Sequence, residues 1–270
     1  MRHRKSSPTE KLRRRPVVDV SRTRYWYHLL LYSTQCENPT QLERLLEPEA
    51  VGKLVDGLRI RRNKWRAYRL GSHTPRPDLV RRVDDKIPGS AEQLNHVFWK
   101  IASQGDGLRL TSESSFSRPP AEIHTLLYRR DWHTGVWKPR RLFSRTFRAI
   151  ERQADLDVLA YLAFMLLTAH RFGNRADCIS IGVSFWYSLL IFAQCPWMTP
   201  VAEAVFELCK VKLLHLATDG QQKLCPTLED FQHASVVLAN SECQWFGCSA
   251  SNLSWRDRAK SDLAPEFRTP

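Results

Sequence analysis

The residues with the clearest chemical capacity are the basic and aromatic side chains gathered in residues 63–75, NKWRAYRLGSHTP. Lys and Arg side chains bind phosphates, and Arg also hydrogen-bonds the edges of guanine bases. Asp78 is the only acidic residue within residues 59–82, so the charge of this stretch favours a polyanionic partner. We therefore predict nucleic-acid contacts from polar and basic side chains of residues 61–73: Arg61, Arg62, Asn63, Lys64, Arg66, Arg69 and His73.

The aromatic residues of this stretch have the spacing of helix anchors. Trp65 and Tyr68 are three residues apart, so they share one face of a helix while the basic residues point elsewhere. Gly71 can adopt the left-handed conformation that ends a helix, and Pro75 favours an extended entry into the next one. The spacing predicts a helix over residues 61–70 that stops at Gly71.

This order of residues, followed by apolar Leu79, Val80 and Val83, resembles the third and fourth helices of the phage-repressor type of helix-turn-helix, also called the xenobiotic-response-element type. Residues 40–46, TQLERLL, resemble the helix before them, so the resemblance covers residues 40–89. It implies a recognition helix that enters the major groove of DNA. Residues 47–60 stand where the family has a short turn, which leaves open whether the motif contacts DNA or only packs.

Periodic apolar residues predict helices on both sides of this motif. In the first half they cover residues 21–35, 40–50, 77–87 and 91–103, with Thr40 as the N-terminal cap of the second. In the second half they cover residues 155–172, 179–195, 200–218 and 228–239, and Gly135 and Pro139 break two further helices. Alternation with period two is almost absent, so the predicted fold class is all-α.

The pattern divides the chain into two helical units. We expect a flexible basic arm at residues 1–20 and a helix-turn-helix-like domain at residues 21–103. A Gly, Ser and Pro-rich linker at residues 104–120 leads to an apolar helical domain at residues 121–245, and a flexible tail follows at residues 246–270.

Composition excludes a disordered chain, because 43% of the residues are hydrophobic and nine are Trp. The formal net charge is +13, and the basic excess lies in the first 150 residues. Seven Cys without a CxxC motif predict reduced thiols and a cytoplasmic location. Residues 178–202 carry no formal charge and could span a bilayer, but Pro196 and Pro200 interrupt them, which favours a buried core helix over a membrane segment.

Catalytic motifs are absent: the sequence has no phosphate-binding GxxxxGK[ST] loop, no HExxH and no GxSxG. Pairs of acidic residues could serve acid-base or metal chemistry, but a solvent-facing role is favoured for each: Asp84 with Asp85, Asp155 with Asp157, and Glu203 with Glu207. His124, Asp131 and His133 complete no catalytic set. We predict no enzyme activity, no metal site and no cofactor.

A second basic aromatic stretch, residues 131–141, contains Trp132, Trp137, Arg140 and Arg141. Such residues can stack on bases or bind phosphates, although a packed loop has the same composition. Both interpretations stay open.

The features together predict a non-enzymatic, regulatory DNA-binding protein, with DNA favoured over RNA. The apolar C-terminal helices would serve self-association or the docking of a partner. The alternative is an adaptor, a subunit of a larger complex that acts on nucleic acid, in which the helix-turn-helix is only structural.

Overall fold

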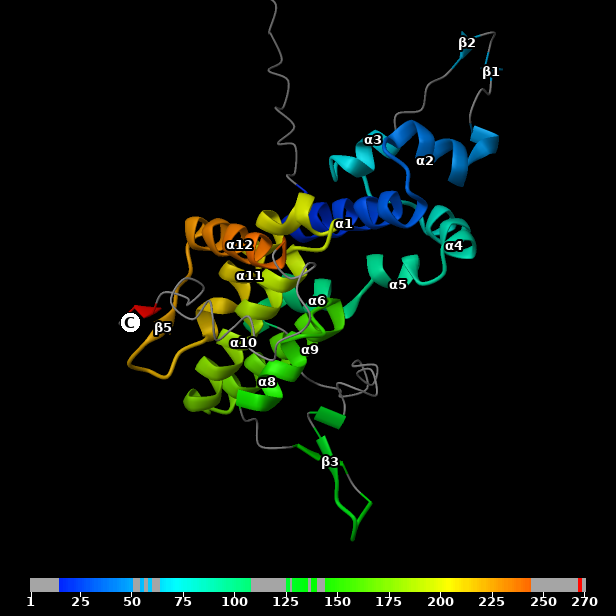
Figure 1. Ribbon diagram of the computed structural model, residues 1–270. Coiled ribbons are helices and arrows are strands. Elements are labelled where there is room, and N and C mark those ends of the chain that lie inside the picture. Colours follow the sequence, from blue (N-terminus) through cyan, green and yellow to red (C-terminus); the bar gives the residue numbers. More distant parts are fainter. Residues whose placement is uncertain are drawn as a thin grey trace, which may run out of the picture.

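The computed structural model of the chain describes residues 15–50, 54–55, 58–59, 64–107, 125–126, 128–135, 137–139, 144–243 and 267–268. These residues form mainly helices, with short antiparallel strand pairs at the periphery (Figure 1). The all-α prediction is therefore confirmed.

Helix α1 (Val17–Thr34) lies between the two halves of the molecule (Figure 1). Its Tyr25 belongs to the larger hydrophobic core, whereas Trp26, Tyr27 and Leu30 belong to the smaller one. Because α1 buries side chains on more than one side, it lacks the single apolar stripe of a surface helix. Residues 17–20, predicted to belong to a flexible arm, are helical instead: Pro16 precedes the helix and Asp19 complements the dipole of its first turn.

The smaller core joins α1 to α2 (Pro39–Leu46), α3 (Lys64–Arg69), α4 (Pro77–Lys86) and α5 (Ser90–Leu94). The predicted cap of α2 is wrong by two residues: Asn38 Oδ1, not Thr40, accepts hydrogen bonds from the first turn, at 3.1 Å from Thr40 N and 3.0 Å from Gln41 N. The reason is Pro39, whose fixed φ suits the first helical position and moves the cap to the residue before it.

The insertion between α2 and α3 begins with a 3-10 turn, η1 (Pro48–Ala50). Strands β1 (Leu54–Val55) and β2 (Leu58–Arg59) then pair in antiparallel register. This hairpin extends beyond the ends of α2 and α3, away from the rest of the molecule (Figure 1).

The helix predicted over residues 91–103 is in fact two helices, α5 and α6 (Val97–Gln104). His96 separates them, because its ring Nδ1 accepts a hydrogen bond from Phe98 N at 3.2 Å and so caps α6. The break turns Phe98, Trp99 and Ile101 of α6 into the larger core, beside the C-terminal helices. Helix α1 therefore contributes to both cores, whereas α6, predicted to belong to the first unit, packs in the larger core. The 3-10 turn η2 (Gly105–Gly107) occupies the start of the predicted linker.

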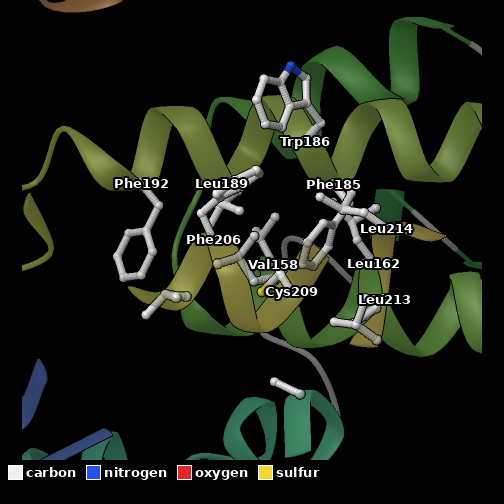
Figure 2. Packing of buried hydrophobic residues seen from close by; sticks show 14 of the residues in the cluster. Val158, Leu162, Phe185, Trp186, Leu189, Phe192, Phe206, Cys209, Leu213 and Leu214 are labelled. Atoms are coloured by element: carbon white, nitrogen blue, oxygen red, sulfur yellow. The ribbon is translucent and has the colours of Figure 1, made fainter. Parts of the chain in front are cut away.

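The larger core is built from the C-terminal helices. They are α8 (Ser144–Glu151), α9 (Leu156–Arg171), α10 (Arg175–Ala193), α11 (Ala202–Lys212) and α12 (Leu228–Cys243), with 3-10 turns η4 (Thr199–Val201) and η5 (Leu214–Leu216). Figure 2 shows Phe185 and Leu189 of α10 packed with Val158 and Leu162 of α9 and with Phe206 of α11.

Helix α10 is long and apolar enough to cross a membrane, yet 67% of its most apolar stretch is buried inside the molecule. It ends at Ala193, before the two prolines of residues 178–202. The apolar residues of α9 and α10 pack within the larger core. Self-association or partner docking through the C-terminal helices stays a prediction.

Strand pairs account for two further differences from the predicted pattern. β3 (Tyr128–Arg130) pairs with β4 (Trp137–Pro139) where broken helices were predicted, and Gly135 turns the chain between them with φ of 68°. β5 (Lys223–Leu224) pairs with β6 (Phe267–Arg268), so these two residues of the predicted tail are held in a strand. The other residues of the tail, 246–266 and 269–270, and most of the linker, 108–120, lie outside the described residues.

Candidate nucleic-acid interface

Three aromatic rings anchor α3 on α1. The indoles of Trp26 and Trp65 stack, with centroids 5.9 Å apart and planes inclined by 14°. Tyr68 meets both rings edge-on, at 6.2 Å from Trp26 and 5.5 Å from Trp65. All three side chains are buried, so the predicted anchors do fix which face of α3 points inward.

The end of α3 is a Schellman motif. Gly71 N donates to Tyr68 O and Ser72 N donates to Ala67 O, each at 2.9 Å. Gly71 adopts φ of 67°, and a Cβ placed on it would lie 2.7 Å from Val20 Cγ1 of α1. Glycine is therefore required twice, for the left-handed conformation and for the close approach of the turn to α1.

Glu47 joins α3 to both neighbouring helices. Its carboxylate is buried, and it accepts a hydrogen bond from Trp65 Nε1 at 2.9 Å. The same carboxylate accepts from Lys64 Nζ at 2.5 Å and from an Arg82 guanidinium nitrogen at 3.2 Å. Two cations and one indole thus satisfy a buried charge that would otherwise be strongly destabilising.

The insertion at residues 47–60 therefore does not detach α3 from α2. Glu47 is both the first inserted residue and the C-terminal cap residue of α2. Lys86 at the end of α4 donates to the carbonyl oxygens of Leu45 and Leu46 at 3.1 and 3.0 Å, which satisfies the last turn of α2. These contacts hold the three helices together although the chain between α2 and α3 is long.

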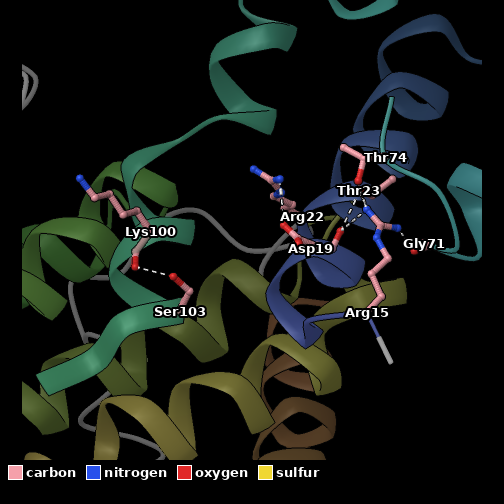
Figure 3. A network of polar contacts seen from close by, with 8 residues as sticks. All are labelled: Arg15, Asp19, Arg22, Thr23, Gly71, Thr74, Lys100 and Ser103. Atoms are coloured by element: carbon pink, nitrogen blue, oxygen red, sulfur yellow. Dashed lines mark hydrogen bonds and ion pairs between the residues drawn. The ribbon is translucent and has the colours of Figure 1, made fainter. Parts of the chain in front are cut away.

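Arg15 holds the loop between α3 and α4 against α1, as Figure 3 shows. Its guanidinium group donates to Gly71 O and Thr74 Oγ1, and at 3.3 Å to Thr23 Oγ1 of α1. One arginine of the predicted basic arm thus has a structural role. Residues 1–14 of that arm lie outside the described residues.

The outward face of α3 and of the following loop is basic. Arg66, Arg69, His73 and Arg76 are all exposed, and in the described part of the chain none of them forms an ion pair. We call these four residues the α3 basic face. Arg81 on α4 is also exposed, but it pairs with Asp78 at 2.8 Å.

The positive charge of this region acts on its neighbours. Burial, with a smaller contribution from the nearby Arg24 and Arg69 guanidinium groups, lowers the pKa of His28 on α1 to about 4. Burial raises the pKa of Tyr27 to about 12, and Arg69 opposes that rise. Arg69 therefore creates a positive potential beside α1, as an anion-binding surface requires.

The structure separates the predicted contact residues into three groups. Arg66, Arg69 and His73 are exposed, whereas Lys64 is half-buried in its ion pair with Glu47. Arg61, Arg62 and Asn63 lie outside the described residues. Of the structural motif, Trp65, Tyr68 and Pro75 are buried, and Gly71 lies in the left-handed region.

Sequence reasoning missed Glu47, Arg15 and Arg76. No signal in the sequence indicates Glu47, because its partners lie 17 to 35 residues away. Arg76 follows the predicted motif directly, and its charge is a sufficient reason to add it to the predicted contact residues.

Three other candidate acids have structural roles. Asp155 Oδ1 caps α9 by accepting from Val158 N at 2.8 Å, and Asp84 accepts from Ala91 N at 2.8 Å. Asp131 accepts from His133 N and Thr134 N within a turn. Among the described residues, no three His, Cys, Asp or Glu side chains converge on a point that could hold a metal ion.

No family model, no curated protein and no solved structure matches the chain. The resemblance to the phage-repressor helix-turn-helix stays a prediction.

Proposed function

We propose that the chain is a non-enzymatic, regulatory DNA-binding protein that contacts the phosphate backbone through the α3 basic face. One observation carries the proposal: Trp65 and Tyr68 are locked inward on Trp26, which leaves Arg66 and Arg69 outward with no described acidic partner. Exposed guanidinium groups on a rigid helix are suited to fork-shaped contacts with phosphate oxygens.

The described part of α3, Lys64–Arg69, covers a short stretch of DNA. Six residues at about 1.5 Å each span roughly 9 Å, the distance of two or three base pairs. Such a helix supports a short base contact together with phosphate contacts from the loop residues His73 and Arg76.

The test is a double charge reversal, Arg66→Glu with Arg69→Glu, measured on mixed-sequence duplex DNA by fluorescence anisotropy at several salt concentrations. We expect affinity to fall at least about tenfold, and the slope of log K against log salt to become shallower by about two, because two phosphate contacts are lost.

A matched control applies the same change of net charge elsewhere. Lys100 on α6 and Arg152 after α8 are exposed and lie in the other half of the molecule. The Lys100→Glu, Arg152→Glu variant should bind duplex DNA nearly as the unaltered protein does. Equal loss in both double variants would show only a general charge effect, and an unchanged Arg66, Arg69 variant would exclude the α3 basic face.

An adaptor role is the second candidate, and the ion pair of Lys64 favours it. A basic residue of α3 that faces Glu47 rather than solvent is one that serves packing. If the unaltered protein binds no duplex DNA at low salt, the motif is structural and the adaptor role replaces the first proposal.

A further inference from the structure

The turn between β3 and β4 is held in one conformation by its own hydrogen bonds. Asp131 Oδ1 accepts from His133 N at 3.0 Å and from Thr134 N at 3.2 Å. Asp131 O accepts from Gly135 N at 2.7 Å, and Arg130 Nε donates to Gly135 O at 3.3 Å. The side chains of this turn are thus presented from a defined backbone.

This turn presents Trp132 to solvent. Trp132 is 84% exposed, although Trp residues are highly buried on average in folded proteins. The His133 ring lies against it, with centroids 3.4 Å apart and planes inclined by 34°. An aromatic pair held on a fixed turn, with most of the indole open, is a surface on which a further flat ring can stack.

The sequence on both sides of Trp132 is basic. Residues 128–141 contain one acidic residue, Asp131, whose carboxylate accepts the backbone hydrogen bonds of the turn. They also contain five basic residues: Arg129, Arg130, Lys138, Arg140 and Arg141. The hairpin projects from the helical body at the end opposite to α3 (Figure 1). Its charge and position suit a polyanion that also offers flat rings.

We propose that the β3–β4 hairpin is a second nucleic-acid site, which binds a single strand by stacking a base on Trp132 while Arg130 contacts the adjacent phosphate. A single strand is specified because its bases expose their faces, whereas those of a duplex are covered by their neighbours. The site takes its class of ligand from the proposed function but shares no residue with the α3 basic face.

A membrane surface fits the turn less well. Interfacial binding requires a broad apolar face beside the aromatic residue. The described neighbours of Trp132 in the turn are Arg130, Asp131, His133 and Thr134, all polar or charged.

The test compares four proteins by anisotropy: the unaltered chain, Trp132→Ala, Trp132→Phe and Phe172→Ala. Phe172 is a matched control, because it is also exposed (82%) and lies after α9, outside the hairpin. Each protein is titrated with labelled oligo(dT), oligo(U), mixed-sequence duplex DNA and vesicles of phosphatidylserine and phosphatidylcholine. Thermal melts should be equal, since neither side chain belongs to a hydrophobic core.

Trp132→Ala should weaken binding of the single strands roughly 5- to 100-fold, while Trp132→Phe retains most of the affinity and Phe172→Ala retains all of it. Duplex affinity should change less than about twofold in all variants. A preference between oligo(dT) and oligo(U) would identify the kind of strand.

The proposal is overturned if Trp132→Ala binds single strands as the unaltered chain does, or if vesicles alone depend on Trp132. It is also overturned if single-strand and duplex affinities fall together. The two proposals can be refuted independently. Duplex binding by the Arg66, Arg69 variant tests the proposed function. Single-strand binding that depends on Trp132 would support the hairpin site even if the proposed function were refuted.

Discussion

Glu47 offers the sharpest test of how the α3 basic face is held. Replacement by Ala removes a buried carboxylate and its contacts with Lys64, Trp65 and Arg82. Breaking a fully buried ion pair typically costs about 3–5 kcal/mol. Here the cations keep part of their hydration, because the Lys64 and Arg82 side chains are 28% and 50% exposed. We therefore expect Glu47→Ala to lower the free energy of unfolding by about 2–3 kcal/mol.

The assay is urea unfolding followed by circular dichroism, with two comparison variants. Glu47→Gln keeps an oxygen that can accept from Trp65 Nε1 but loses the charge, so its loss should be smaller, about 1–2 kcal/mol. Glu49→Ala removes an exposed carboxylate from the adjacent 3-10 turn and should change stability by less than about 0.5 kcal/mol. A Glu47→Ala protein as stable as the Glu49→Ala protein would refute the role given to Glu47.

The Glu47→Gln substitution also tests the proposed DNA binding. Glu47→Gln releases Lys64 from its carboxylate partner, so Lys64 becomes available to phosphate. Under the proposed DNA binding, the salt slope should steepen by about one in the Gln variant. A slope that stays constant while stability falls would place Lys64 outside the interface.

Two further predictions concern α1 and the turn that packs on it. Gly71→Ala should lower the free energy of urea unfolding by about 2–4 kcal/mol, because the added Cβ meets Val20 and the residue has a φ of 67°. Gly89→Ala is the control: its φ is 86° but the space around it is open, so the loss should be only about 1–2 kcal/mol. Equal losses in the two variants would contradict the close approach of Gly71 to α1. Because the pKa of His28 falls from 6.5 to about 4 on folding, the unfolded chain binds the proton more readily between these values, so stability should fall as pH decreases through that window. After allowance for the partial exposure of His28, the loss is about 1 kcal/mol, and a His28→Gln variant should lack this part of the acid sensitivity.

Local signals predicted the helices and the anchors of α3 well. The spacing of Trp65, Tyr68 and Gly71 concerns one helix and its end, so the sequence alone indicated the buried face and the left-handed Gly71 that ends the helix. The errors arose where a single residue redirects the chain. The capping ring of His96 divides a continuous apolar pattern into α5 and α6, and Pro39 moves the cap of α2 to Asn38.

Contacts between distant residues could not be predicted in this way. Lys64 was expected to face DNA, but a carboxylate that is 17 residues away in sequence and buried in the fold binds it. The β3–β4 hairpin was not predicted, because each of its strands has three residues, too few to show an alternation of apolar and polar residues. Arg66 and Arg69 are exposed as expected, since nothing distant competes for them in the described part of the chain.

The two hydrophobic cores share α1, and this limits how independent the α3 basic face can be. Tyr25 contacts Trp99 and Phe192 on one side of α1, at 5.5 and 6.1 Å between ring centroids, while Trp26 stacks on Trp65 on another. A shift of α1 that loosens one set of rings therefore strains the other, because packed interiors do not deform continuously. A change in the C-terminal helices that moves α1 would also move the support of Arg66 and Arg69. The proposed interface is best regarded as one face of the whole protein and not as a detachable module.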